Sequence, residues 1–379
     1  MTRKPIRVLH VIDHLGVGGT QVLLVNLCTG SDDPTRSVRH EVLSLHGEGV
    51  HREALLRAGV GTRSLAASKR NLPLMLLRLV AHLSRRDYDI LHLHLQASSL
   101  LGSLLAPWLR SVPVVVTVYA LKEQLSATEF SLFRLIEPFV TTYVSLWERN
   151  DDLLSIGVRR DKIAVIPIGL DLRGASADRH RQVREDLAAT YGFDPDRPLL
   201  LSVARLSADR HIHLLVECLA EIVAKRPDAL LLMIGDGPER SRLEGMVQQR
   251  GIEQNIIFGN VRTDLWNIYP GCDVYLTSSG NCDTGVAAMQ AMACERPVVA
   301  YTIAPMAEPQ KLCECQGVFI QARDPATMAQ SLDELLADVA EARRLGKRAR
   351  DAVVDGFSLD RMLQRYRTLY LQIVQAGRN

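Results

Sequence analysis

The chain has 379 residues, of which 47% are apolar and 23% charged, and its net charge is +2. A chain of this length is too long for one ordinary hydrophobic core and predicts two domains. The small net charge gives no reason to expect a nucleic-acid partner, and no run approaches the ~20 apolar residues that span a bilayer. The start of the chain lacks the apolar run of a signal peptide. The seven cysteines are scattered and odd in number, so we expect reduced thiols in a cytoplasmic protein.

Short apolar runs that are typical of buried strands alternate with helix-like stretches along the chain. In the first half these runs cover residues 6–12, 41–45, 90–93, 112–118, 143–145 and 163–166. After a polar stretch the pattern starts again, with runs at 199–203, 229–234, 256–258, 274–276, 297–300 and 317–320. Strand–helix alternation predicts a mostly parallel, doubly wound sheet. The chain is therefore predicted to be an α/β protein with two Rossmann-like domains, residues 1–175 and 176–357.

A glycine-containing loop follows the first strand and leads into an apolar helix. It carries Gly18, Gly19 and Thr20. Glycines between a strand and a helix allow the backbone to approach a ligand closely, and the N-terminus of a helix attracts anions. The loop lacks the full G-x-G-x-x-G pattern, so a tight turn without a ligand is the alternative.

Residues 69–86 combine basic side chains with many leucines. A helix of this kind could lie on a membrane surface. A helix with one buried face and snorkelling arginines explains the same pattern, and we favour it. Lys and Arg outnumber Asp and Glu in residues 1–190. This excess is explained either by attraction to an anionic membrane or acidic acceptor, or by a solvated basic face.

Two histidines, His92 and His94, lie at the end of the strand at 90–93. Such a pair could indicate a metal site. No carboxylate or third ligand is clustered with it in the sequence, so we expect histidines that pack at a strand end. Tyr119 follows the strand at 112–118. Its hydroxyl can hydrogen-bond a ligand but is a poor general base near neutral pH.

Two cations, Arg205 and Arg210, follow the strand at 199–203. Two fixed cations of this kind can bind a phosphate or diphosphate and stabilise negative charge that grows on an oxygen. A surface pair of cations at a strand end is the alternative. Gly235 begins the next motif, in which glycines permit a tight turn before a helix that opens at Pro238.

The last motif runs from Cys282 to Gln290. Together with the motifs from residue 199 onward, its order and spacing resemble the nucleotide-sugar-binding half of the retaining glycosyltransferases of family 4, which have the GT-B fold. That family usually carries two glutamates separated by seven residues, and this chain has Cys282 and Gln290 at their places. The adjacent Asp283 could supply a carboxylate if the loop shifts by one residue.

The resemblance implies a GT-B protein, in which two Rossmann-like domains face a central cleft and the helix at 358–379 packs back on the first domain. It assigns catalysis to Arg205 and Arg210, which would grip the diphosphate, and to Tyr119, which stands where the family often has a histidine. Gln290 would bind the ribose. The donor-binding residues that it implies are Gly18, Gly19, Thr20, Gly235, Val261, Cys282, Asp283, Thr284, Gly285, Val286 and Gln290. It implies no metal ion, and no cofactor besides the nucleotide-sugar donor substrate.

From this resemblance we expect a cytoplasmic glycosyltransferase of the hexosyltransferase type, in polysaccharide biosynthesis, with peripheral contact to the inner face of the membrane as an option. It would transfer a sugar, with retention, from a nucleoside-diphosphate sugar to a hydroxyl of a glycan, a lipid-linked saccharide or a small molecule. The loss of both glutamates favours an alternative, a catalytically degenerate subunit that binds a partner or a glycan. A sugar-nucleotide epimerase is a remoter alternative. A second copy of the chain or a glycosyltransferase partner is the expected protein contact.

Overall fold

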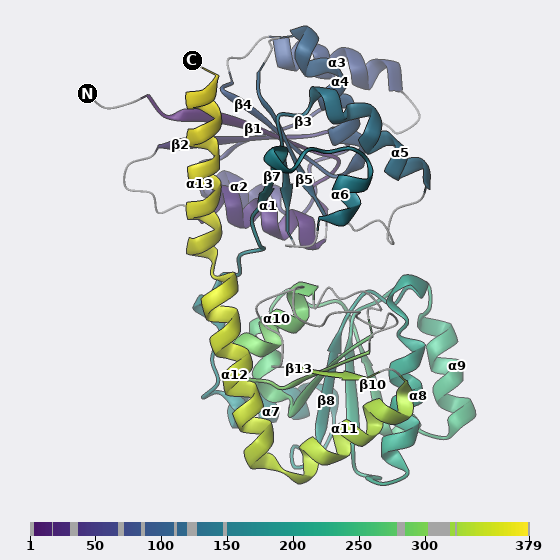
Figure 1. Ribbon diagram of the computed structural model, residues 1–379. Coiled ribbons are helices and arrows are strands. Elements are labelled where there is room, and N and C mark those ends of the chain that lie inside the picture. The colour runs from purple at the N-terminus through teal and green to yellow at the C-terminus, as the bar shows by residue number, and fades with distance from the viewer. Residues whose placement is uncertain are drawn as a thin grey trace. The chain divides into compact units, whose positions relative to one another are not determined.

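The computed structural model describes residues 4–16, 18–30, 37–66, 72–84, 88–109, 112–119, 127–146, 150–278, 285–301, 319–322 and 324–377. The chain forms two compact units, both drawn in Figure 1. Unit 1 comprises residues 1–171 and 357–379, and unit 2 comprises residues 172–356. The divisions predicted from the sequence lie after residues 175 and 357.

Unit 1 is built on a seven-stranded sheet in the order β3-β2-β1-β4-β5-β6-β7. Its strands are β1 (Ile6–Ile12), β2 (Val38–Ser44), β3 (Gly61–Ser64), β4 (Ile90–His94), β5 (Val114–Val118), β6 (Thr142–Ser145) and β7 (Ile163–Val165). All neighbouring strands of this sheet run parallel. Each apolar run predicted in the first half forms a strand, with small shifts at the ends. β3 was not predicted, because this edge strand is polar and none of its residues is fully buried.

Helices cover both faces of this sheet. They are α1 (Gly19–Thr29), α2 (Arg52–Arg57), α3 (Leu72–Ser84), α4 (Gln96–Leu109), α5 (Ala127–Ile136), α6 (Asp151–Ser155) and α13 (Leu359–Ala376). α1 and α13 pack on the face that carries Val8 and Ile90 (Figure 1). α3 and α4 pack on the face that carries Leu9 and Leu91. Alternate side chains of β1 therefore enter two different apolar cores.

α3 buries one face in unit 1. Met75, Leu79 and Leu83 are buried, and the guanidinium of Arg78 donates to the carbonyl of Leu65 at 2.6 Å. Leu77, on the other side of the helix, is 66% exposed. The buried face explains the apolar pattern of this segment without a membrane. Among the residues that the structure describes, no helix is long and apolar enough to cross a bilayer.

Unit 2 contains a second parallel sheet, of six strands in the order β10-β9-β8-β11-β12-β13. Its strands are β8 (Leu199–Val203), β9 (Leu230–Ile234), β10 (Ile256–Gly259), β11 (Val274–Thr277), β12 (Val298–Tyr301) and β13 (Phe319–Ala322). Numbered within the unit, this is the Rossmann order 3-2-1-4-5-6, which the first six strands of unit 1 also follow.

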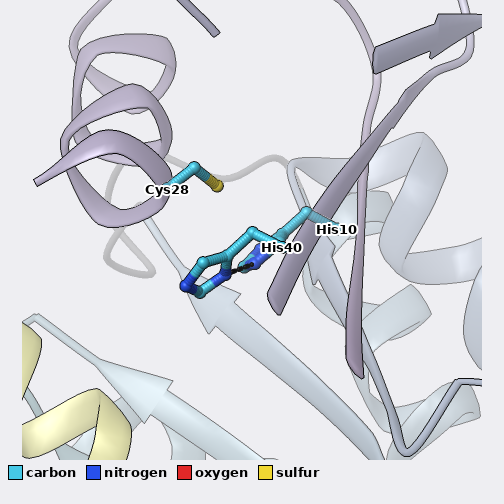
Figure 2. A group of neighbouring side chains, drawn as sticks. All are labelled: His10, Cys28 and His40. Carbon is cyan, nitrogen blue, oxygen red and sulfur yellow. Dashed lines mark hydrogen bonds between the residues drawn. The ribbon is translucent and has the colours of Figure 1, made fainter. Parts of the chain in front are cut away.

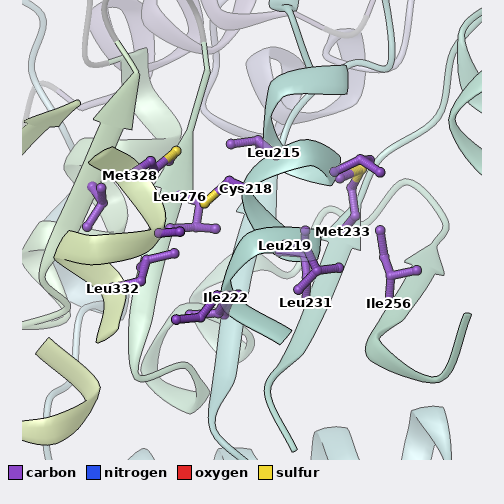
Figure 3. Close-up of a cluster of buried hydrophobic side chains, with 14 of the residues drawn as sticks. Leu215, Cys218, Leu219, Ile222, Leu231, Met233, Ile256, Leu276, Met328 and Leu332 are labelled. Carbon is purple, nitrogen blue, oxygen red and sulfur yellow. The ribbon is translucent and has the colours of Figure 1, made fainter. Parts of the chain in front are cut away.

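The helices of unit 2 cover both faces of its sheet. They are α7 (His180–Tyr191), α8 (His213–Val223), α9 (Arg240–Arg250), α10 (Gly285–Ala293), α11 (Pro325–Ala337) and α12 (Val339–Phe357). Figure 3 shows Leu219 and Ile222 of α8 packed with Leu231 of β9 and Leu332 of α11 in one cluster. β9 is buried at every position, because a parallel sheet covered on both faces needs apolar residues on both sides.

Candidate functional site

In each sheet the first three strands are added toward one edge, and the following strands are added toward the other edge. We call the place where the direction changes the reversal point; it lies between β1 and β4 in unit 1 and between β8 and β11 in unit 2. Ligands of open parallel sheets bind outside the carboxyl ends of the strands at this point. The loops after β1 and β4 begin at Asp13 and Leu95, and those after β8 and β11 begin at Ala204 and Ser278. These four loops are the first candidates for functional residues.

The loops after β8 and β9 are held together by backbone hydrogen bonds. The N–H of Leu206 donates to the carbonyl of Asp236 at 3.0 Å, and the N–H of Glu239 donates to the carbonyl of Leu206 at 2.9 Å. Gly235 has a φ of +143°, and a Cβ there would lie 1.9 Å from the carbonyl oxygen of Ala204. A side chain cannot be accommodated, so the structure gives Gly235 a packing role at the edge where Arg205 and Arg210 lie.

Arg205 and Arg210 extend from the loop after β8, and their side chains are 67% and 46% exposed. Oδ2 of Asp209 lies 3.4 Å from Nη2 of Arg205 and 3.5 Å from Nε of Arg210. Partial burial by itself raises the pKa of Asp209, but the Ser207 hydroxyl and the two guanidinium groups outweigh it and hold this pKa below its usual value. Two cations therefore share one carboxylate, and their remaining N–H donors are open to an anion.

The main chain at Arg210 is fixed by the strand on the other side of the reversal point. Ser278 follows β11 and donates its hydroxyl to the carbonyl of Arg210 at 2.8 Å. His211 comes next, with a φ of +50° in the left-handed region, which costs a residue other than glycine about 1–2 kcal/mol. The second cation is thus held in place by both strands that border the reversal point.

Gln290 lies on α10, and its amide is oriented by a buried tyrosine. Tyr269 is fully buried and donates its hydroxyl to Oε1 of Gln290 at 3.0 Å. Burial raises the pKa of Tyr269 well above its usual value, so the phenol keeps its proton and acts as the donor. Tyr269 therefore engages one lone pair of the Gln290 carbonyl, and the NH₂ group can donate to a ligand.

Other predicted donor-binding residues lie at the same edge of unit 2. Val261, just after β10, is 57% exposed and offers an apolar surface. Gly285 begins α10 with a φ of +61°, and Val286 follows it half-buried. The predicted residues Cys282, Asp283 and Thr284 lie outside the described residues.

In unit 1 the glycine loop leads directly into α1. Gly18 is the N-cap of this helix, and Gly19 and Thr20 are its first two residues. A Cβ on Gly18 would lie 2.3 Å from Oε1 of Gln21. The side chain of Gln21 is buried and donates to the carbonyl of His14 at 3.3 Å. The glycine thus leaves room for a side chain that holds the preceding loop.

Asp13, which the sequence reasoning did not single out, joins the two strands at the reversal point of unit 1. It follows β1, and its carboxylate accepts the N–H of Ser98 at 2.7 Å and that of Ala97 at 3.2 Å. These are unpaired donors in the first turn of α4. Asp13 therefore caps a helix from a different strand, a role that no local sequence signal reveals.

Tyr119 lies just after β5 and contacts a buried histidine. Its hydroxyl is 2.6 Å from Nδ1 of His94. Burial raises the pKa of Tyr119 well above its usual value and lowers the pKa of His94 to about 3. Both groups are therefore neutral near neutral pH, and neither is a ready proton acceptor or donor for chemistry there.

His92 and His94 are fully buried at the end of β4, and the fold brings a third histidine, distant in the sequence, next to them. His10 of β1 brings a ring nitrogen to within 4.8 Å of theirs. Its Nδ1 lies 3.0 Å from Nε2 of His94, and its Nε2 lies 2.9 Å from Nδ1 of His40. Sequence reasoning missed His10 and His40 because they lie on separate strands, β1 and β2, that only the folded sheet brings beside β4.

Comparisons with known proteins extend over both units. Anabaena HepE, solved in complex with UDP, has a TM-score of 0.81 at 17% identity, over 97% of this chain and 100% of that chain. N-acetyl-alpha-D-glucosaminyl L-malate synthase of Bacillus anthracis is 24% identical over 78% of this chain and 77% of its own. D-inositol 3-phosphate glycosyltransferase of Xylanimonas cellulosilytica is 28% identical over 73% of this chain and 70% of its own.

Two family models match the chain, one for each unit. Glycosyltransferase Family 4 matches residues 17–173, and Glycosyl transferases group 1 matches residues 183–352. The chain is a family 4-like glycosyltransferase with the GT-B fold. The predicted fold is thus confirmed, and so is the broad expectation of a transferase. The degenerate-subunit alternative is not favoured.

The matched segments of this glycosyltransferase contain the predicted site residues. The group 1 segment includes Arg205, Arg210 and Gln290, and the family 4 segment includes Gly18 and Tyr119. The role of each single residue stays a prediction, as do retention and the consequence of the two missing glutamates.

Proposed function

We propose that this glycosyltransferase binds a nucleoside-diphosphate sugar on unit 2 and transfers the sugar, with retention, to an alcohol. The exposed pair Arg205 and Arg210 at the reversal point carries this proposal. The two guanidinium groups and the one carboxylate of Asp209 leave a net positive charge, which suits a diphosphate. Anabaena HepE, which has a similar fold, was solved with UDP, and a nucleoside diphosphate is a ligand that this pair of cations suits.

The ribose and the base of the donor would be bound by neighbouring side chains. The Gln290 amide would donate to a ribose hydroxyl, because its carbonyl is engaged by Tyr269. The exposed side chain of Val261 would cover part of the base by apolar contact. The acceptor alcohol is assigned to unit 1. We expect it to be a small hydroxyl compound, because the names of the two relatives above contain L-malate and D-inositol 3-phosphate.

Catalysis would come from positioning and from the cations. Negative charge grows on the diphosphate as the bond to the sugar breaks, and Arg205 and Arg210 would stabilise it. Tyr119 is an unsuitable general base, since burial raises its pKa. We assign it a positioning role, with its hydroxyl held by His94 at 2.6 Å.

The test is turnover of a panel of UDP-, GDP- and ADP-sugars, followed by release of the nucleoside diphosphate with and without added alcohols. One donor should be consumed, and NMR of the product should show the anomeric configuration of the donor. Arg205→Ala and Arg210→Ala should each lower kcat by about 10²–10³, which is typical for loss of one such charge-stabilising donor.

Arg344→Ala is the matched control, because Arg344 is an exposed arginine of unit 2 paired with Glu341 on α12. Its turnover should equal that of the unmodified chain. Absence of turnover and of binding for all three nucleotide classes would contradict the proposal and favour the degenerate-subunit alternative. Turnover that is unaffected in both arginine variants would contradict the assigned role of the cations.

A further inference from the structure

A second group of reactive side chains lies within unit 1 and has no part in the proposed transfer. His10 of β1, Cys28 of α1 and His40 of β2 bring one ligand atom each to within 4.8 Å of one another (Figure 2). We propose that these three side chains bind one divalent transition-metal ion of the Zn²⁺ type, through His10 Nε2, His40 Nδ1 and Cys28 Sγ.

The sheet register creates this group. Val8 of β1 pairs with His40 of β2, so His10, two residues further along, lies diagonally next to His40 on the same face. α1 crosses that face, and Figure 2 shows Cys28 on the helix beside the two rings. Nε2 of His10 is 2.9 Å from Nδ1 of His40. Two imidazole nitrogens on a tetrahedral zinc ion lie about 3.4 Å apart, so these two nitrogens would move apart by about 0.5 Å to bind the ion, with Sγ of Cys28 approaching from within 4.8 Å.

The chemistry of the donor set suits such an ion. Imidazole and thiolate together favour zinc and its neighbours over calcium or magnesium. Cys28 is 4% exposed, and its thiol is free of any disulfide. Burial raises the pKa of Cys28, so the thiol keeps its proton until a metal displaces it. Three protein ligands leave a fourth position for water.

The surroundings of His10 match those of a metal-bound histidine. Such a histidine donates its other ring N–H to a fixed acceptor. Nδ1 of His10 lies 3.0 Å from Nε2 of His94, and Nδ1 of His94 lies 2.6 Å from the hydroxyl of Tyr119. With His10 and His94 as Nδ1–H tautomers, this chain of hydrogen bonds holds His10 with its Nε2 lone pair facing His40.

The neighbouring triad His10, His92 and His94 is a poorer site. Both ring nitrogens of His92 are engaged, Nδ1 with Tyr370 at 2.7 Å and Nε2 with Thr117 at 2.7 Å. A metal there would break one of these hydrogen bonds. Metal binding at the site with Cys28 breaks only the hydrogen bond between His10 and His40.

The proton balance of binding follows from these ligands. Cys28 loses its thiol proton and binds as the thiolate. His40 stays neutral and carries its proton on Nε2, the nitrogen that faces away from His10. Each ion therefore releases one proton to solvent. This release is measurable in the unmodified chain, without any substitution.

The experiment titrates the metal-stripped full chain with Co²⁺ as the spectroscopic probe. One equivalent should produce tetrahedral cobalt bands and a thiolate-to-cobalt charge-transfer band, and Zn²⁺ should abolish both. Cys28→Ser should lose the charge-transfer band, and His40→Gln should weaken binding by more than about 100-fold, because loss of a direct ligand exceeds the ~10–100-fold cost of losing an outer-shell partner. Cys218→Ser is the matched control, because Cys218 is a buried free thiol in α8, and it should behave as the unmodified chain.

Two results would overturn the proposal. One is the absence of a stoichiometric cobalt complex, or of proton release, in the unmodified chain. The other is a complex that Cys28→Ser leaves intact but His213→Gln abolishes, since His211 and His213 are neighbouring rings in unit 2 and offer the competing site. Neither readout depends on transferase activity, so failure of the metal site and failure of the proposed transfer are distinguishable.

Discussion

Acidification from about pH 7.5 to about pH 5.5 is predicted to destabilise metal-free unit 1 much more than unit 2. His10, His92 and His94 are fully buried, and no carboxylate among the described residues hydrogen-bonds to them. Burial lowers the pKa of all three, and that of His94 to about 3, against ~6.5 in an unfolded chain. Below pH ~6.5 the histidines of the unfolded state bind protons that the folded state does not bind. The free energy of unfolding is therefore highest above pH ~6.5, and it falls as the pH approaches the pKa values of the folded state.

The size of the effect follows from the number of buried rings. Each ring costs about 1.4 kcal/mol for every pH unit below ~6.5. The three fully buried rings therefore cost about 4 kcal/mol at about pH 5.5, and His40 of β2, whose pKa burial lowers to about 4, adds about 1.4 kcal/mol. The sum is a large part of the ~5–15 kcal/mol that stabilises a typical domain.

Urea unfolding with hydrogen exchange resolved by peptide measures the two units separately, in the presence of a chelator. Peptides from β1 and β4 should lose protection against exchange as the pH falls, while those from β8 and β9 change little. His94→Asn should reduce the pH slope of unit 1 by about 1.4 kcal/mol per pH unit. Equal losses in both units, or an unchanged slope in the variant, would refute this reasoning.

Three further substitutions test the packing and the site. Gly235→Ala should destabilise unit 2 by at least about 2 kcal/mol in calorimetry, because a Cβ there lies 1.9 Å from a carbonyl oxygen. Gly245→Ala is the control: its Cβ meets open space on α9, and the substitution should stabilise unit 2 by up to about 1 kcal/mol. Equal effects of the two substitutions would contradict the account. Gln290→Ala should weaken nucleotide binding about 2- to 12-fold through loss of one hydrogen bond, and unchanged binding in titration calorimetry would remove Gln290 from the site. Asp13→Ala should cost unit 1 about 1–2 kcal/mol in urea unfolding, because it leaves two N–H groups of α4 unpaired; an unchanged midpoint would argue against the cap.

The strands and the two-unit organisation were predictable because buried parallel strands are apolar at almost every position, as in β9. Arg205, Arg210 and Gly235 could be singled out because they lie in the segments after β8 and β9, where their order and spacing resemble the motifs of family 4. β3 was missed because an edge strand needs little apolar surface, and Gly61–Ser64 is polar.

Contacts between polar residues that are far apart in the sequence could not be predicted. His10 lies 84 residues from His94 and 30 from His40 in the sequence, so only the strand order brings them together. Asp13 caps α4 from 85 residues away, and no capping signal precedes that helix locally. The orientation of Gln290 depends on Tyr269, whose partner is a matter of tertiary packing.

The central claim is that Arg205 and Arg210 bind the diphosphate of the donor. Titration calorimetry with the pairs UDP and UMP, GDP and GMP, and ADP and AMP tests it most directly. For one base the diphosphate should bind at least about tenfold more tightly than the monophosphate, in line with ~1.5–3 kcal/mol for a charge-assisted hydrogen bond, and the double variant Arg205→Ala, Arg210→Ala should abolish that difference. A difference that survives in the double variant, or equal affinities in the unmodified chain for all three pairs, would contradict the account.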